Sequence, residues 1–93
     1  MFEALTKAKN NLALVLQRLG RLFEAEALLR ELLSDDPWNG DISTNLAGIL
    51  LQQGRPQEGA SILYPCLKKI NYHPIGWDTL GACIQDLGDI ETA

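Results

Sequence analysis

The sequence is poor in the residue types that catalytic and metal sites need. It has one histidine, His73, and two cysteines, Cys66 and Cys83, whose spacing matches neither a zinc site nor a redox pair. The glycines are spread along the chain and form no phosphate-binding loop. One histidine without a serine elbow leaves no nucleophile–base pair. These absences predict that the protein is not an enzyme and binds no cofactor and no metal.

Basic runs and long apolar runs are also scarce. The formal net charge is −4, the pI is near 4.7, and Lys68-Lys69 is the only basic doublet. Such a chain repels nucleic acid. No apolar run has the length of a membrane span, and the first residues lack the basic and then apolar pattern of a signal peptide. We expect no nucleic-acid partner, no membrane partner and a cytoplasmic location.

The sequence does contain an internal repeat of 34 residues. Gly20, Gly54 and Gly88 follow one another at this step. The same step relates further columns of similar residues: Leu12, Leu46 and Leu80; Ala13, Ala47 and Gly81; Leu16, Leu50 and Ile84; Ala25, Gly59 and Ala93. Repetition at this length is typical of stacked helical repeats.

Each period contains two amphipathic stretches on either side of a glycine. Apolar residues recur at helical spacing around Gly20 and Gly54, which predicts helices that end at these glycines. Pro56 and Pro74 suit a first helical turn, where a missing amide donor is tolerated. Pro65 lies inside a predicted helix and should kink it near residues 61–64 or end it early. The predicted helices cover residues 6–19, 22–35, 40–53, 56–69 and 74–87.

One run of residues has a recognisable spacing, Trp77-x2-Leu80-Gly81-x2-Ile84, and Ala25-x3-Leu29 and Pro37 extend it in the first period. The pattern resembles the tetratricopeptide signature W-x2-L-G-x2-Y. The resemblance implies an all-α fold, a right-handed superhelix of antiparallel helix pairs. It also implies a single domain over residues 1–93, with repeats at about 6–39 and 40–73 and a partial third repeat at about 74–93.

The resemblance further implies a protein–protein interaction module that holds an extended peptide or partner segment in a concave groove. The first helix of each repeat would line the groove, with these candidate residues: Lys7, Asn10, Asn11, Leu14 and Arg18; Asp41, Thr44, Asn45, Gly48 and Gln52; Ile75, Asp78, Thr79, Ala82 and Asp86. Asn11 and Asn45 share a column. Their amides can pair with a peptide backbone or can bond neighbouring helices, and both interpretations stay open.

The C-terminal end of the array presents apolar residues. Repeat arrays need a polar terminal cap, and the last predicted helix would leave four residues partly uncovered: Trp77, Leu80, Ile84 and Leu87. We therefore expect homodimerisation through this end. Two alternatives to a peptide-binding module stay open. The repeats could be a self-assembly module, or they could be the substrate-selecting fragment of a larger enzyme.

The remaining prominent residues have structural interpretations. Trp38 and Tyr72 share a column in the turns between repeats, where rings more often cover a gap than anchor a partner. The small residues of one column should let paired helices approach closely: Ala13, Ala47 and Gly81. The charged residues of the second helix should form a solvated face: Arg21, Glu24, Glu26, Arg30 and Glu31.

Overall fold

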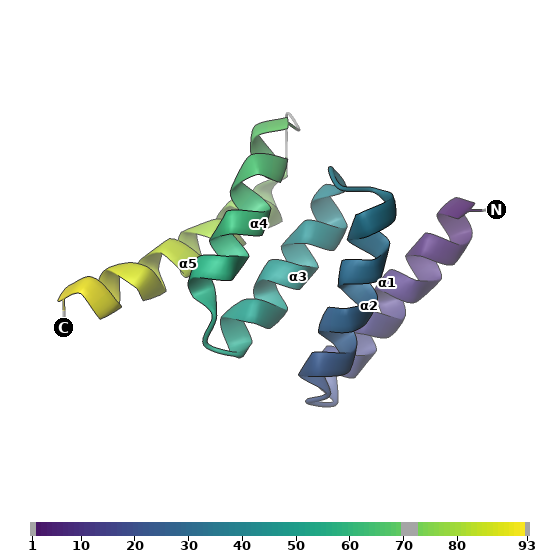
Figure 1. Cartoon of the computed structure of the whole chain (residues 1–93), viewed down its shortest axis with the longest axis horizontal. Helices are drawn as coiled ribbons and strands as arrows, with labels where there is room; N and C mark the ends of the chain where they lie inside the picture. The colour runs from purple at the N-terminus through teal and green to yellow at the C-terminus, as the bar shows by residue number, and fades with distance from the viewer. Residues whose placement is uncertain (1, 70–72, 93) are drawn as a thin grey trace.

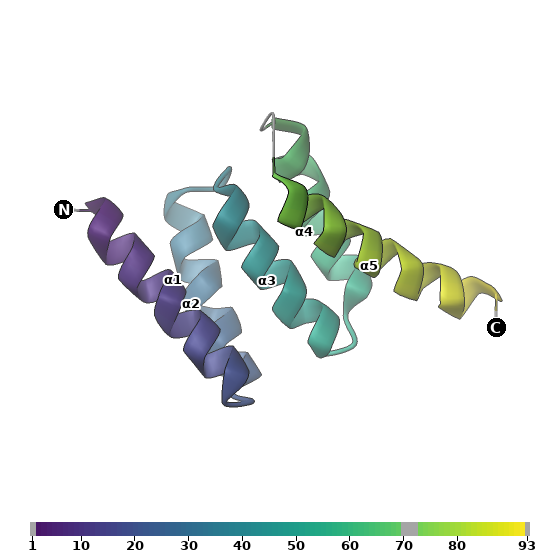
Figure 2. The same cartoon turned by 180° about the vertical axis from the view of Figure 1, so that it is seen from behind.

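A computed structural model describes residues 2–69 and 73–92 of the chain, and this part is helical without any strand. The helices are α1 (Phe2–Arg18), α2 (Leu22–Asp35), α3 (Gly40–Gln52), α4 (Pro56–Lys69) and α5 (Pro74–Thr92). They lie in two layers, with α2 and α4 on one side and α1, α3 and α5 on the other (Figures 1 and 2). The molecule is an elongated slab of 47 × 32 × 19 Å. The all-α prediction is confirmed, and α2, α3, α4 and α5 begin where the sequence predicts. Helix α1 begins at Phe2, so its predicted start at residue 6 is wrong.

The turn inside each of the first two repeats is built in the same way. Gly20 and Gly54 adopt φ angles of 81° and 75°, a left-handed conformation in which a side chain would be strained. The arginine after each glycine donates its backbone N–H to a leucine carbonyl five positions earlier, Arg21 to Leu16 at 2.9 Å and Arg55 to Leu50 at 2.8 Å. These bonds satisfy carbonyls that the helix end would otherwise leave open.

Helix α5 does not end where the sequence predicts. Gly88 shares the column of Gly20 and Gly54, yet α5 continues through it to Thr92, so the predicted end at residue 87 is wrong. Glycine permits the left-handed conformation but does not impose it. After Gly20 and Gly54 the next helix packs back on the previous one, and those contacts select the turn. No helix follows α5 in the described chain.

The core lies between the two layers. Ala13 and Ala47 are fully buried, as predicted, and a Cβ placed on Gly59 of α4 would lie 3.2 Å from the Ala47 carbonyl oxygen. These small residues let paired helices approach closely. Gly81 differs from its column: it is exposed, and a Cβ there would meet nothing within 4 Å. The prediction of a close helix contact at Gly81 is wrong, because no helix of the described chain covers that face of α5.

Helix α4 runs without interruption past its internal proline. Pro65 lies between buried residues of the same helix, and α4 continues to Lys69, so an early end is ruled out. The ring removes one amide donor, which leaves the Ser61 carbonyl without its helical partner. Burial of Leu63 and Leu67 against α3 and α5 holds the helix together despite that loss.

The C-terminal end of the array is only partly covered. Trp77 and Ile84 are 46% and 56% exposed, as predicted for this end. Leu80 is only 3% exposed, so its predicted exposure is wrong. It packs with Ala47, Leu63 and Leu67 in the core shared by α3, α4 and α5. The side chain of Leu87 lies outside the described residues.

Candidate functional site

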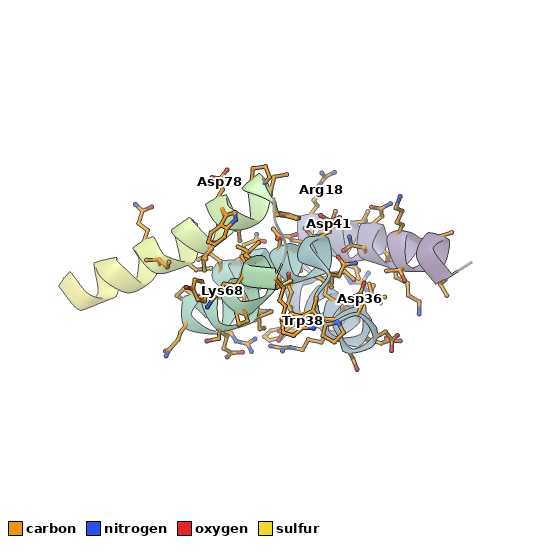
Figure 3. The ribbon with its side chains drawn as sticks, turned by 90° about the horizontal axis from the view of Figure 1, so that it is seen from above. Arg18, Asp36, Trp38, Asp41, Lys68 and Asp78 are labelled. Atoms are coloured by element: carbon orange, nitrogen blue, oxygen red, sulfur yellow. The ribbon has the colours of Figure 1, made fainter. Side chains whose placement is uncertain are left out.

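Most of the candidate groove residues lie on one layer, formed by α1, α3 and α5. Figure 3 shows Arg18, Asp41 and Asp78 on the same side of the molecule, away from Trp38 and Lys68. Several candidate side chains are exposed on this layer: Lys7, Asn11, Arg18, Asp41, Gln52, Ile75 and Asp78. Others are half-buried: Asn10, Leu14, Asn45, Gly48, Thr79 and Ala82. The side chain of Asp86 lies outside the described residues.

Two amide pairs join α1 to α3 on this layer. Asn45 donates from Nδ2 to Oδ1 of Asn10 over 2.9 Å. Gln17 donates from Nε2 to Oε1 of Gln52 in the same way, about two turns further along both helices. Asn45 therefore has a structural partner, and that partner is Asn10 rather than Asn11. Each bonded amide still has hydrogen-bonding capacity that the pair does not use.

A hollow of about 770 Å³ opens at one end of this layer, between the first half of α1 and the turn that joins α2 to α3. It is lined by Thr6, Lys7, Asn10, Asp35, Asp36, Asn39, Asp41 and Ile42. Asn39 shapes the turn, because its side chain accepts from the Ile42 backbone at 3.0 Å and donates to Asp36 at 3.1 Å. Three carboxylates and one lysine give the hollow a negative charge.

Thr44 is the candidate that the structure buries. It is 5% exposed, and its hydroxyl has no hydrogen-bond partner among the described residues. It lies beneath α5, where a Cβ on Gly76 would come within 2.9 Å of Thr44 Oγ1 and 2.7 Å of Leu67 Cδ2. Gly76 thus brings α5 onto α3, a role that the 34-residue repeat does not reveal. Because Thr44 is covered, its side chain is not available to a partner on this layer.

The sequence model of the tetratricopeptide repeat matches residues 16–64, which is more than half of the chain. The chain belongs to the tetratricopeptide repeat family. Tetratricopeptide repeats are generally protein-interaction modules and non-enzymatic scaffolds. No curated protein matches the chain closely enough to count as a relative.

Helix α5 begins with a histidine cap. His73 Nδ1 accepts from the backbone N–H of Gly76 at 2.9 Å, and His73 Nε2 lies 2.7 Å from Asp41 Oδ1. Because Nδ1 is an acceptor, the neutral ring carries its proton on Nε2 and donates it to Asp41. Asp41 is therefore oriented by the following repeat, although its side chain stays largely exposed. Sequence reasoning missed this pair, because the two residues are 32 positions apart.

A ring of four charged side chains joins α2 to the start of α4. Glu26 accepts from Arg30 Nε at 2.8 Å and from Arg55 Nη1 at 2.9 Å. Glu58 closes the ring through Arg55 Nη2 at 2.6 Å and Arg30 Nη2 at 3.3 Å. Glu26 is 8% exposed, so its predicted place on a solvated face is wrong. The arginines that cover it come from its own helix and from the next repeat.

The ring shifts the ionisation of its members. Burial by itself raises the pKa of Glu26, but the hydrogen bonds from Arg30 and Arg55 outweigh burial and hold the pKa below its usual 4.5. The hydrogen bond from Arg55 likewise lowers the pKa of Glu58. The pKa of Arg55 is raised by its hydrogen bonds to Glu58 and Glu26. Glu26, Glu58 and Arg55 therefore stay charged near neutral pH.

Trp38 lies in the turn between the first two tetratricopeptide repeats and is 49% exposed. The Nζ atom of Lys69 lies 4.9 Å from the centre of its ring, a cation–π contact that joins this turn to the end of α4. This contact agrees with the structural interpretation of Trp38 as a cover between repeats. Tyr72, which shares its column, lies outside the described residues.

The described residues contain neither a cluster of metal ligands nor a membrane-spanning helix. No group of three or more histidine, cysteine, aspartate or glutamate side chains is arranged to hold a metal ion. No helix in the described part of the chain is both long and apolar enough to cross a membrane. Cys66 and Cys83 are buried in the packing of α4 and α5.

Proposed function

We propose that this tetratricopeptide repeat domain holds an extended segment of a partner protein on the layer formed by α1, α3 and α5, which we call the binding face. The observation that carries the proposal is the arrangement of amides across that layer. Asn45 is bonded to Asn10, and Asn11 stands exposed beside them on α1. Amides that both donate and accept can pair with the backbone of a peptide without reading its sequence.

Charge gives the binding face a direction. Arg18 stands exposed on α1, and no ion-pair partner for it is found among the described residues. The hollow near Lys7 contains three carboxylates, and Asp78 is exposed on α5. A partner segment that places a basic side chain in the hollow and an acidic one near Arg18 would satisfy both. A segment whose charges all have the same sign would not satisfy both the hollow and Arg18.

The test uses purified intact chain as bait for a displayed library of random peptides. The Asn11→Ala/Arg18→Ala variant removes one amide and one cation from the binding face. The Gln57→Ala/Lys68→Ala variant removes the same groups from exposed positions on α4. We expect selected peptides to bind the intact chain and the α4 variant alike, and to lose about tenfold or more in affinity for the α1 variant. Equal binding to both variants would contradict the proposal.

A second candidate function is self-association through the C-terminal end of the array. Trp77 and Ile84 on α5 and Tyr64 on α4 expose between 46% and 56% of their surface. An open apolar surface of this kind is typical of a contact site. Sedimentation at increasing concentration tests it, with Ile84→Glu as the variant expected to abolish any dimer. A chain that remains monomeric at high concentration rules this function out.

A further inference from the structure

A second apolar surface lies at the other end of the array, on α1. Leu5, Ala8, Leu12, Val15 and Leu19 are spaced three and four residues apart in turn, and we call them the α1 seam. All five are exposed, and the four large side chains expose 54%, 50%, 49% and 65% of their surface in chain order. This spacing places them in one stripe, the arrangement by which one helix packs along another. Aligned exposed leucines on a domain of this size indicate a contact surface.

The internal repeat shows what fits such a stripe. Ala8, Leu12 and Val15 are 34 residues before Ile42, Leu46 and Ile49 of α3. In α3 these three residues are at most 1% exposed and belong to the core that α2 and α3 share. Helix α2 packs against α3. The stripe that is open on α1 is therefore the stripe that an amphipathic helix covers on α3.

The α1 seam is also more apolar than its counterpart. Leu5 and Leu19 correspond to Asn39 and Gln53, which are polar residues at the two ends of α3. The apolar stripe on α1 thus extends over a longer stretch of helix than the interface between the two repeats requires. Stacking of the repeats does not require Leu5 and Leu19 to be apolar, and both side chains are exposed to solvent. A helix that lies along most of α1 would cover them.

The charges beside the α1 seam determine the sign of the occupant. Arg18 flanks one side and has no ion-pair partner among the described residues. Lys9 flanks the other side, where Glu31 of α2 lies 3.8 Å from it and offsets its charge. The net charge beside the α1 seam is therefore the positive charge of Arg18. A second copy of the chain, with its α1 against this α1, would add a second such cation, whereas an occupant with acidic flanks would be attracted to Arg18.

We propose that the α1 seam is a docking surface for an amphipathic helix of a partner polypeptide, with leucines spaced three and four residues apart and acidic residues beside them. Helix α2 has this chemistry, because its leucines are accompanied by Glu24, Glu31 and Asp35. The α1 seam and the binding face share the flanking residue Arg18 but are otherwise formed by different side chains of α1, so helix docking on the seam does not require peptide binding on the binding face. The contact is that of one helix, and its affinity is modest.

The test uses a fluorescent synthetic peptide with the sequence of residues 21–36 as the probe and the intact chain as the receptor. Fluorescence anisotropy should show saturable binding. Leu12→Glu, which buries a carboxylate under the docked helix, should weaken binding about tenfold or more. Ile84→Glu changes a residue of similar exposure at the opposite end of the array, and it should leave binding unchanged.

Leu5→Glu is the second α1 seam variant and should weaken binding even if Leu12→Glu lowers the melting temperature. The proposal is overturned if the peptide shows no saturable binding, or if Ile84→Glu abolishes binding while Leu5→Glu and Leu12→Glu do not. It is also overturned if sedimentation shows a dimer of the intact chain that Leu12→Glu dissociates. A second copy would then be the occupant of the α1 seam.

Discussion

Arg55 donates a hydrogen bond of 2.9 Å from Nη1 to Oε1 of Glu26, and so connects two tetratricopeptide repeats that the turn at residues 36–39 joins along the chain. Glu26 belongs to the second helix of its repeat, and Arg55 precedes the second helix of the next. The contact links α2 to the residue that precedes α4 and adds a charged interaction to the apolar packing of the core.

We predict that this contact makes the stability of the protein depend on acid. The folded pKa of Glu26 lies below 4.5, so near that pH the unfolded chain binds more protons than the folded one. The stabilisation is complete above about pH 5 and is lost as the pH falls through the lower folded pKa. Thermal melts between neutral pH and about pH 3 should show the melting temperature fall.

The matched variant for this prediction is Glu26→Gln, which keeps the shape of the side chain and removes its charge. At neutral pH it should lower the free energy of unfolding by about 1–3 kcal/mol, because charged hydrogen bonds from Arg30 and Arg55 are lost. The melting temperature of this variant should also fall less steeply as the pH decreases. An equally steep loss in Glu26→Gln would assign the acid sensitivity to other carboxylates.

Alanine substitutions at two glycines of α5 should change the free energy of unfolding in opposite directions. A Cβ on Gly76 would lie 2.7 Å from Leu67 Cδ2 and 2.8 Å from His73 Nδ1, so Gly76→Ala must shift these side chains or α5 itself and should cost about 1–3 kcal/mol. A Cβ on Gly81 meets nothing within 4 Å, so Gly81→Ala should stabilise the helix by about 0.5–1 kcal/mol. Urea unfolding measures both, and the same sign of change in both variants would contradict the packing described.

The burial of the α3 stripe can be tested against the exposure of its counterpart on α1. Leu46 is fully buried, so Leu46→Ala should lower the free energy of unfolding by about 2–5 kcal/mol. Leu12 occupies the same column and is 50% exposed, so Leu12→Ala should change it by less than about 1 kcal/mol. Chemical denaturation gives both values. A similar loss in the two variants would mean that a partner copy covers Leu12 in solution.

Asn45 and Asn11 share a column, but their substitutions by alanine should differ in their effect on the stability of the protein. Asn45→Ala breaks the bond to Asn10 and should cost about 0.5–1.5 kcal/mol. Asn11 is exposed, so Asn11→Ala should leave the melting temperature within error. A loss of stability in Asn11→Ala would assign that residue a structural role and weaken its place on the binding face.

Local chemistry allowed the repeating parts of the fold to be predicted. The columns at Gly20 and Gly54, the prolines at 56 and 74, and the helical spacing of the leucines set the helices and the turns within repeats. These signals act over a few residues, so one sequence is enough to interpret them. The small side chains of Ala13 and Ala47 predicted the close contacts between paired helices for the same reason.

The 34-residue period with helical spacing inside it was enough to predict a stack of helix pairs, because such a period is typical of helical repeats. The period does not predict which members of a column are buried in the folded array: Leu46 but not Leu12, Ala47 but not Gly81, and Glu26 under Arg55. Burial depends on which helix lies against a residue, and the neighbours of the first and last helices differ from those in the middle. Residues of one column have similar side chains, but the environment of each side chain depends on the helices that lie against it.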